Sequence, residues 1–174
     1  MPIALHATNL WKAYLAGVSG CSARVWALRG CSLVARRGER LAIVGGAASG
    51  KTSLLHCLGG LRRVDAGSVI NEGGLRARVT VVGALRHADA AALALLDADH
   101  DRATTPDDSA WLEQLHALPR HRTIVLATRD PMLAVTFADR VIRLVDGRID
   151  DPAVAPARRV AECGRPPVEL PMLR

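Results

Sequence analysis

The chain has 174 residues, of which 49% are apolar and only 3% aromatic, and its formal net charge is +6. This length suits one domain with a core built mainly from Ala, Leu and Val. The positive charge comes almost wholly from arginine, and no RNA- or DNA-binding motif accompanies it, so no nucleic-acid partner is expected. No stretch approaches the ~20 apolar residues of a transmembrane helix, and the N-terminus lacks the apolar run of a signal peptide. We therefore expect a cytoplasmic protein that reaches a membrane only through a partner.

Two patterns follow one another along the chain. Residues 1–37 contain short β-type segments at Ile3–Leu5, Arg24–Leu28 and Cys31–Ala35. From residue 41 to residue 149, apolar strands alternate with helical stretches, which predicts an α/β fold with right-handed crossovers and a mainly parallel sheet. The expected strands are Leu41–Val44, Val79–Val82, Leu93–Asp97, Thr123–Ala127 and Val141–Val145, and the expected helices are Lys51–Leu61, Ser109–Leu118 and Pro131–Ala138. Residues 1–149 thus form one predicted domain, followed by a Pro-rich extended or disordered tail over residues 150–174.

The segment Gly45–Thr52 matches the pattern GxxxxGK[ST], the phosphate-binding P-loop or Walker A motif. A short apolar strand precedes it, and a stretch with leucines at helical spacing follows it. In such a loop the backbone N–H groups converge on phosphate oxygens, and the helix N-terminus adds partial positive charge. Lys51 is one of only two lysines in the chain, and it occupies the position where the motif requires lysine. A chance match in an Ala- and Gly-rich chain is the alternative, and the flanking strand and helix argue against it.

A second acidic motif follows the apolar run Leu93–Leu96, which ends in Asp97. P-loop enzymes place such an aspartate (Walker B) beside the P-loop hydroxyl, where the two hold Mg²⁺, so Thr52 and Asp97 form a predicted metal pair. A turn-capping aspartate is the structural alternative. The DxDxD spacing is also similar to the start of an EF-hand loop, but its sixth position is Arg102 instead of glycine. A strand followed by DxD is typical of haloacid-dehalogenase-type phosphatases as well, and that class has no P-loop.

The four cysteines, at positions 21, 31, 57 and 163, include no CxxC pair. They also show no metal-ligand spacing with the six histidines. Reduced thiols are therefore predicted.

The order of several blocks along the chain resembles the ATP-binding subunit of an ABC transporter, of the lipoprotein-releasing and macrolide-export type. The likeness spans about residues 5–149, apart from one gap. Besides the P-loop, the blocks that carry it are Asn9–Tyr14, Val25–Leu33, Arg37–Gly45, Leu54–Leu61, Asp65–Val69 and Ala138–Ile149. The resemblance implies a P-loop NTPase core with an N-terminal antiparallel β segment.

The same resemblance implies roles for individual residues. Tyr14, the only tyrosine, would stack on the adenine, and Asp97 would be the Walker B carboxylate. Thr52 and Asp97 would hold Mg²⁺. The residues implied to bind ATP are Tyr14, Gly45, Gly46, Ser49, Gly50, Lys51, Thr52, Ser53 and Asp97. The structural alternative for Tyr14 is an ordinary half-buried tyrosine.

The chain departs from the family pattern at the positions that carry hydrolysis. The glutamate that follows the Walker B aspartate is replaced by Ala98, which can neither accept a proton nor orient water. The switch histidine falls at Arg129, which cannot deprotonate but could pair with a phosphate. The D-loop falls on Ala103–Thr104. Between Val82 and Ala84 the helical subdomain, the Q-loop and the LSGGQ signature are missing.

The expected function is an ABC-transporter-like subunit that binds Mg-ATP or Mg-ADP, with hydrolysis weak or lost. It would serve as a regulatory or structural partner of a membrane permease or of a full-length ABC ATPase subunit, at the inner face of the membrane. Two alternatives remain open. One is a competent ATPase completed by a partner chain. The other is a P-loop phosphotransferase, which would need a lid with clustered arginines.

Overall fold

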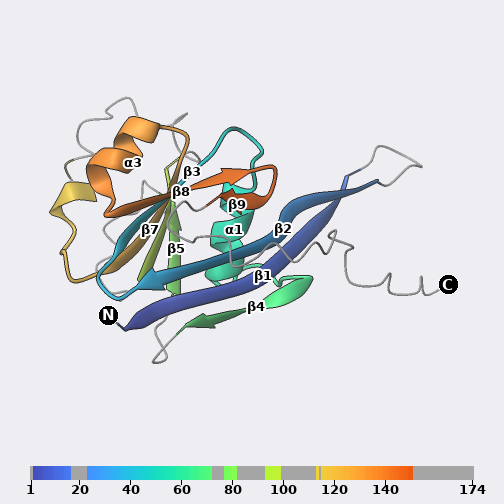
Figure 1. The fold of residues 1–174 in the computed structure, drawn as a ribbon, viewed down its shortest axis with the longest axis horizontal. Coiled ribbons are helices and arrows are strands. Elements are labelled where there is room, and N and C mark those ends of the chain that lie inside the picture. Colours follow the sequence, from blue (N-terminus) through green and yellow to red (C-terminus); the bar gives the residue numbers. More distant parts are fainter. Residues whose placement is uncertain are drawn as a thin grey trace.

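The computed structural model of the chain describes residues 2–16, 23–71, 77–81, 93–98, 113 and 115–150, and residues 77–81 are described by their backbone. Two sheets form the fold (Figure 1). The antiparallel sheet has the order β2-β1-β4, and the six-stranded sheet has the order β5-β6-β7-β3-β8-β9. The strands are β1 Ile3–Ala16, β2 Ala23–Arg36, β3 Arg40–Val44, β4 Ala66–Asn71, β5 Ala77–Val81, β6 Leu93–Asp97, β7 Thr123–Thr128, β8 Arg140–Val145 and β9 Arg148–Asp150. The helices are α1 Lys51–Leu58 and α3 Pro131–Phe137.

The five strands β5, β6, β7, β3 and β8 run parallel, and β9 pairs antiparallel with β8. This confirms the predicted α/β fold with a mainly parallel sheet and an antiparallel N-terminal part. Strands β6 and β7 are buried at every position, as expected for central strands covered on both faces. That double burial is why both strands read as unbroken apolar runs in the sequence.

Alternate residues of β6 pack into two separate cores. Leu93 and Leu95 join the core between the two sheets, which also holds α1. Ala94 and Leu96 face the opposite side, where Leu133 and Phe137 of α3 pack. The parallel sheet is therefore covered by α1 and the antiparallel sheet on one face, and by α3 on the other.

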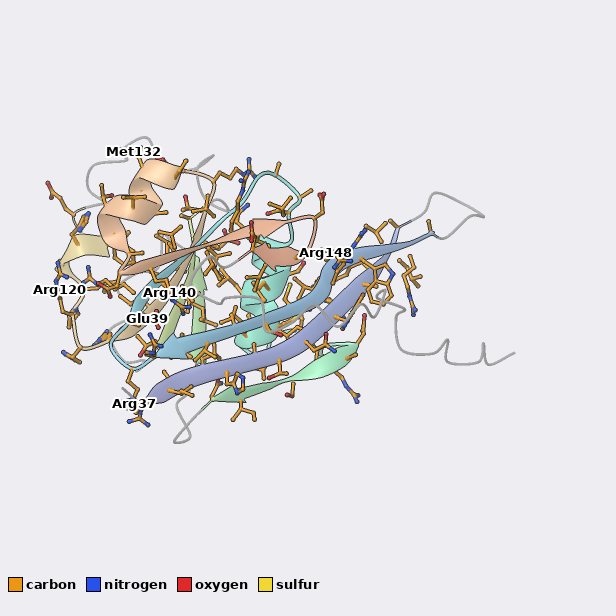
Figure 2. All side chains as sticks on the ribbon, in the orientation of Figure 1. Arg37, Glu39, Arg120, Met132, Arg140 and Arg148 are labelled. Atoms are coloured by element: carbon orange, nitrogen blue, oxygen red, sulfur yellow. The ribbon has the colours of Figure 1, made fainter. Side chains whose placement is uncertain are left out.

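An ion pair joins the two sheets at the start of β3. Arg140 Nε lies 2.7 Å from Glu39 Oε1, and another nitrogen of the same guanidinium donates to the Val34 carbonyl of β2 (Figure 2). The second oxygen of Glu39 accepts the Arg36 N–H at 2.6 Å. The end of β2, the start of β3 and the start of β8 are thus held together, which fixes how the antiparallel sheet crosses the parallel one.

Several expected elements differ from the structure in extent. The short N-terminal segments were wrong in length, because β1 and β2 are continuous fourteen-residue strands. Their register shifts several times, and Asn9 and Gly30 have positive φ, so strict alternation of apolar and polar residues is broken. Helix α1 ends at Leu58 rather than Leu61, because Gly59 and Gly60 follow it. Strands β4 and β9 were not predicted.

Several other expectations concern residues outside the described ranges. These are the tail from residue 151 onward, the D-loop position Ala103–Thr104, the gap at Val82–Ala84 and most of the helix Ser109–Leu118. Within the last of these, residues 113 and 115–117 are helical. In the part of the chain that the structure describes, no helix has the length and apolar character needed to cross a lipid bilayer.

Cys31 and Cys57 are free, buried thiols. Burial raises the pKa of the Cys31 thiol to about 11, and burial also raises the pKa of Cys57. Because the thiolate is the reactive form, we expect neither thiol to react with a maleimide at pH 8 in the folded protein. Labelling followed by mass spectrometry, with Cys21 and Cys163 replaced by serine, measures this; denaturant should make both thiols react within minutes.

The raised pKa values also set the direction of a pH effect on stability. Between pH 9, the ordinary pKa of the thiol, and about pH 11, the unfolded chain loses the Cys31 proton while the folded chain keeps it. The free energy of unfolding should therefore fall as pH rises through this window. A Cys31→Ala variant should lose part of that slope, and rapid labelling of Cys31 in the folded protein at pH 8 would contradict the expectation.

Candidate nucleotide-binding site

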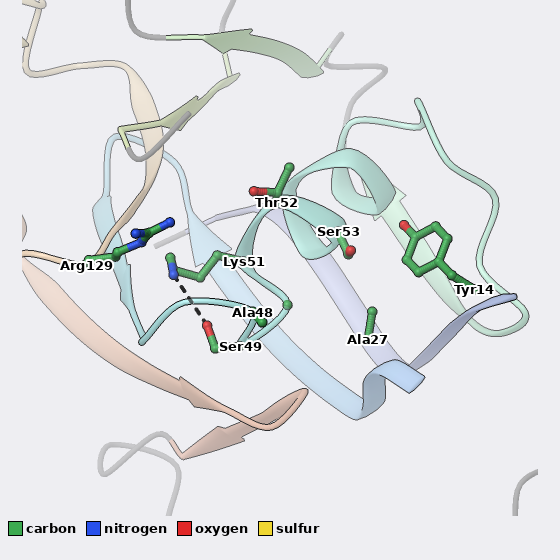
Figure 3. Close-up of a pocket in the computed structure, with 9 residues that line it drawn as sticks. Tyr14, Ala27, Ala48, Ser49, Lys51, Thr52, Ser53 and Arg129 are labelled. Atoms are coloured by element: carbon green, nitrogen blue, oxygen red, sulfur yellow. Dashed lines mark hydrogen bonds between the residues drawn. The ribbon is translucent and has the colours of Figure 1, made fainter. Parts of the chain in front are cut away.

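A pocket of about 250 Å³ lies at the N-terminus of α1 (Figure 3). Its floor is the loop that leaves β3, and its ends are formed by residues far apart in the sequence. Figure 3 shows Tyr14 and Arg129 at opposite ends, with Lys51, Thr52 and Ser53 between them. The lining residues are Tyr14, Ala27, Ala48, Ser49, Gly50, Lys51, Thr52, Ser53 and Arg129.

The loop between β3 and α1 has a backbone conformation that requires glycine at one position. Gly50, the N-cap of α1, has φ 103°, and a Cβ added there would lie 2.3 Å from the Ala27 carbonyl oxygen of β2. The Gly50 carbonyl accepts the Leu54 N–H at 2.8 Å, so the helix starts directly at Lys51. Glycine at this position therefore lets the loop pass close to β2 and turn into the helix.

Ala27 comes close to the loop because β2 is irregular at that residue. Lys12 and Ala13 are consecutive on β1, yet they pair with Leu28 and Trp26, which leaves Ala27 as an extra residue on β2. Such a bulge bends a strand locally and re-aims its groups. Ala27 consequently lines the pocket, and its carbonyl faces the P-loop glycine.

The turn between β8 and β9 braces the same loop from the other side. Gly147 N–H donates to the Ser49 carbonyl at 3.0 Å, while its own carbonyl accepts Arg29 N–H at 2.7 Å. Gly147 has φ 72°, and a Cβ there would lie 2.6 Å from the Ala27 oxygen. The P-loop is thus held between β2 and the β8–β9 turn, which explains why the distant block Ala138–Ile149 belongs with the P-loop pattern.

Lys51 is buried at 5% exposure, although its side chain is charged. Its Nζ donates to the carbonyl oxygens of Gly45 and Gly46, each at 2.7 Å, and lies 3.4 Å from Ser49 Oγ. A buried ammonium is stable only when oxygen acceptors compensate its lost hydration. The loop carbonyls supply that compensation here, and they hold the positive charge against the pocket.

Thr52 and Asp97 are joined by a hydrogen bond from Thr52 Oγ1 to Asp97 Oδ2 at 2.6 Å. Asp97 ends β6 and is 4% exposed, and Thr52 is the second residue of α1. In the sheet, Asp97 pairs with Ala127 of β7, and β7 in turn pairs with β3, from which the P-loop departs. Adjacent parallel strands therefore bring the two predicted metal ligands together at one edge.

The oxygens of Thr52 and Asp97 are hard donors of the kind that Mg²⁺ prefers. Among the described residues, no group of three or more His, Cys, Asp or Glu side chains converges on a metal position. The pair therefore fits a magnesium ion that takes its remaining ligands from a bound phosphate and water, and does not fit an all-protein metal cage.

Ala98 and Arg129 are the residues that the sequence resemblance places at two catalytic positions. Ala98 is 7% exposed, and its N–H donates to the Ala127 carbonyl at 2.9 Å. Arg129 follows directly after β7 and is exposed at the pocket. Asp130, the next residue, caps α3 by accepting from Met132 N–H and Leu133 N–H. None of the nine described residues that line the pocket carries a carboxylate.

The structure brings most of the predicted site residues together at this pocket. Tyr14, Ser49, Gly50, Lys51, Thr52 and Ser53 line the pocket, and Asp97 reaches it through Thr52. Gly45 and Gly46 act through their carbonyls on Lys51. Sequence reasoning missed Ala27 and Ala48 as lining residues. Ala48 lies inside the motif, whereas no sequence signal marks the bulge at Ala27.

Comparison with known proteins agrees with this geometry. The family model described as ABC transporter matches residues 28–133. The lipoprotein-releasing system ATP-binding protein LolD of Legionella pneumophila (strain Paris) is 42% identical over 67 residues, covering 38% of this chain and 28% of LolD. The methionine import ATP-binding protein MetN of Rhizobium johnstonii is 49% identical over 47 residues, covering 27% of this chain and 13% of MetN. The matches thus span under a third of these relatives.

Solved structures share the fold. A dimeric post-hydrolysis state of the ATP-binding cassette MJ0796, bound to ADP and Pi, matches with TM-score 0.63 and 18% identity, over 84% of this chain and 98% of that one. A nucleotide-free ATP-binding cassette from an ABC transporter matches with TM-score 0.62 and 11% identity, over 84% of this chain and 89% of that one. The family match covers more than half of the chain and shows that the chain belongs to the ABC transporter family, whose fold these solved structures share.

Proposed function

We propose that this chain binds Mg-ATP and Mg-ADP in the pocket at the N-terminus of α1. The observation that carries the proposal is the convergence of the buried Lys51 ammonium and the Thr52–Asp97 pair on that one pocket. Lys51 and the loop N–H groups would bind the phosphates, and Tyr14 would stack on the base. Thr52 and Asp97 would hold Mg²⁺, which supplies charge neutralisation for the phosphates when it is bound.

We further propose that hydrolysis is weak or lost, so that the subunit works as a pseudo-ATPase. The methyl group of Ala98 cannot orient or deprotonate an attacking water, and the pocket lining contains no carboxylate among the described residues. Loss of a catalytic carboxylate typically costs a factor of ~10²–10⁴ in rate. Arg129 would contact phosphate as a fixed positive charge.

The role would be regulatory or structural, beside a permease or a full-length ABC ATPase subunit at the inner face of the membrane. Strands β5 and β6 are direct neighbours in the parallel sheet, and only residues 82–92 connect them. This short connection supports a reduced form without the helical subdomain. Such a chain could offer a P-loop to a partner but no LSGGQ signature in return, so a symmetric hydrolysing homodimer is not expected.

Calorimetric titration of the full chain with ATP and ADP, with Mg²⁺ or with EDTA, tests the proposal, with steady-state turnover measured on the same samples. We expect micromolar, Mg²⁺-strengthened binding and turnover near the detection limit. No binding at millimolar nucleotide would remove the proposal. Turnover that appears when permease-containing membranes are added would favour the partner-completed ATPase, and ADP release with a phosphorylated acceptor would favour a phosphotransferase.

The Asp97→Asn variant should lose the benefit that Mg²⁺ gives to ATP binding. Asparagine keeps the shape and can still accept from Thr52 Oγ1, but it lacks the charge that a divalent cation needs. We expect the ratio of ATP affinities with Mg²⁺ and with EDTA to fall about tenfold. Asp130→Asn is the matched control, because asparagine also caps α3 and the same charge is removed beside Arg129. An unchanged ratio in Asp97→Asn would exclude Asp97 as a metal ligand.

A further inference from the structure

The pairing of β1 with β4 ends at Trp11, shortly before β1 reaches the pocket at Tyr14. β4 begins at Ala66, which pairs with Trp11, so beyond Trp11 this edge of β1 has no strand partner among the described residues. Asp65, the residue before β4, takes that place. Its N–H donates to the Trp11 carbonyl at 2.8 Å, and its Oδ2 accepts the Ala13 N–H at 2.7 Å. The carboxylate therefore continues the sheet edge by one more residue.

The other oxygen of Asp65 holds a lysine beside the pocket tyrosine. Lys12 Nζ lies 3.1 Å from Asp65 Oδ1, and the Lys12 side chain is only 15% exposed. The same ammonium lies over the Tyr14 ring, 5.6 Å from its centroid, which is within cation–π range. Asp65, Lys12 and Tyr14 thus form one connected chain of contacts, which we call the tyrosine clasp.

The clasp reaches the pocket through one member only. Tyr14 lines the pocket, whereas Lys12 and Asp65 do not. The ammonium therefore contacts the tyrosine ring without lining the pocket itself. A cation over an aromatic ring is attracted by the electron-rich ring face, so the ammonium helps to hold the ring in place. On this edge of β1, Asp65 is the residue that accepts the N–H of Ala13, directly before Tyr14.

We propose that Lys12 and Asp65 are positioning residues that hold Tyr14 at its end of the pocket, in place for its ring to stack on a purine base. This inference rests on the proposed nucleotide binding. It predicts that the clasp contributes to affinity for ATP and contributes nothing to affinity for a polyphosphate without a base. If the clasp were merely structural, its loss would weaken the binding of ATP and of the polyphosphate to the same extent.

The test compares ATP with inorganic tripolyphosphate by calorimetry in the full chain. Tyr14→Ala removes the stacking ring and therefore measures the whole contribution of base stacking. We expect it to weaken ATP binding about 5- to 100-fold. Lys12→Met keeps the aliphatic stem and removes the ammonium, and it should weaken ATP about 3- to 10-fold while tripolyphosphate stays within about twofold. Lys12→Arg keeps the charge and should restore ATP to within about twofold. Asp65→Asn removes the charge partner of Lys12 but leaves the ammonium, so it should weaken ATP binding by no more than Lys12→Met does, with tripolyphosphate within about twofold.

A second readout uses the single tyrosine of the chain. Incorporation of 3-fluorotyrosine gives one ¹⁹F resonance, which reports on Tyr14 alone. We expect ATP to shift this resonance strongly and tripolyphosphate to shift it little, and we expect Lys12→Met to move it before any ligand is added. These spectra also show directly whether each variant is folded.

The outcomes separate the two proposals. If the wild-type chain binds neither ligand, the proposed function fails and this inference fails with it. If the wild type binds both, but ATP and tripolyphosphate weaken equally in Lys12→Met or neither changes, the clasp is structural only and the inference alone is overturned.

Discussion

The Lys51→Ala variant should bind ATP about 10- to 100-fold more weakly than the wild type, with or without Mg²⁺. The substitution removes a charged donor to phosphate, and hydrogen bonds to charged groups are worth roughly 1.5–3 kcal/mol. The contact of Lys51 Nζ with Ser49 Oγ, at 3.4 Å, is longer than its contacts with the carbonyl oxygens of Gly45 and Gly46, each at 2.7 Å. A phosphate oxygen can replace this contact at the smallest cost, which lets the ammonium bind ligand while it still holds the loop carbonyls.

Two controls separate the lost charge from a damaged loop. Lys51→Met keeps most of the buried stem and should weaken ATP nearly as much as Lys51→Ala, because the ammonium is absent from both. Arg63→Ala removes the same charge from an exposed position outside the pocket, and its ATP affinity should stay within about twofold of wild type. Thermal unfolding without ligand shows how far the loop depends on Lys51. If Lys51→Ala binds ATP within about twofold of wild type, Lys51 is not a phosphate ligand.

The parts of the fold that sequence reasoning found are those whose signal is local. The P-loop pattern needs only Gly45, Gly50, Lys51 and Thr52 at fixed spacing after a strand. The central parallel strands are covered on both faces, so β6 and β7 stand out as apolar runs. Asp97 could be placed beside Thr52 because P-loop enzymes put the aspartate that ends such an apolar strand next to the P-loop hydroxyl.

The parts that it missed depend on contacts between distant residues. β4 contains Gly67 and Ser68, which favour turns, and it becomes a strand through its pairing with β1. A Cβ at Gly67 would lie 2.3 Å from the Asn9 carbonyl, so the close approach of the two strands needs glycine there. The contact of Lys12 with Asp65 spans 53 positions of sequence separation. Nothing in either local sequence indicates that the two residues meet beside Tyr14.

The same kind of distant contact makes Gly50→Ala the most destabilising glycine substitution we expect in the loop. Its added Cβ would lie 2.3 Å from the Ala27 oxygen, and its φ of 103° is one that alanine rarely adopts. Backbone strain of ~1–3 kcal/mol and overpacking of ~1–3 kcal/mol together predict a loss of about 2–6 kcal/mol in the free energy of unfolding. For a chain of this size that is roughly 5–20 °C in Tm, measured by calorimetry or circular dichroism.

Substitutions at two other glycines separate the cost of backbone strain from the cost of overpacking. Gly60 has φ 72° with nothing within 4 Å of an added Cβ, so Gly60→Ala should show backbone strain alone, at about 1 kcal/mol. Gly46 lacks both the positive φ and any close neighbour, and Gly46→Ala should stay within about 0.5 kcal/mol of wild type. If Gly50→Ala costs no more than Gly60→Ala, β2 yields to the added methyl group and the bulge at Ala27 does not fix the loop. If the larger cost is observed, the shape of the P-loop depends on the N-terminal sheet, and β1 and β2 hold both the Tyr14 end and the phosphate end of the pocket.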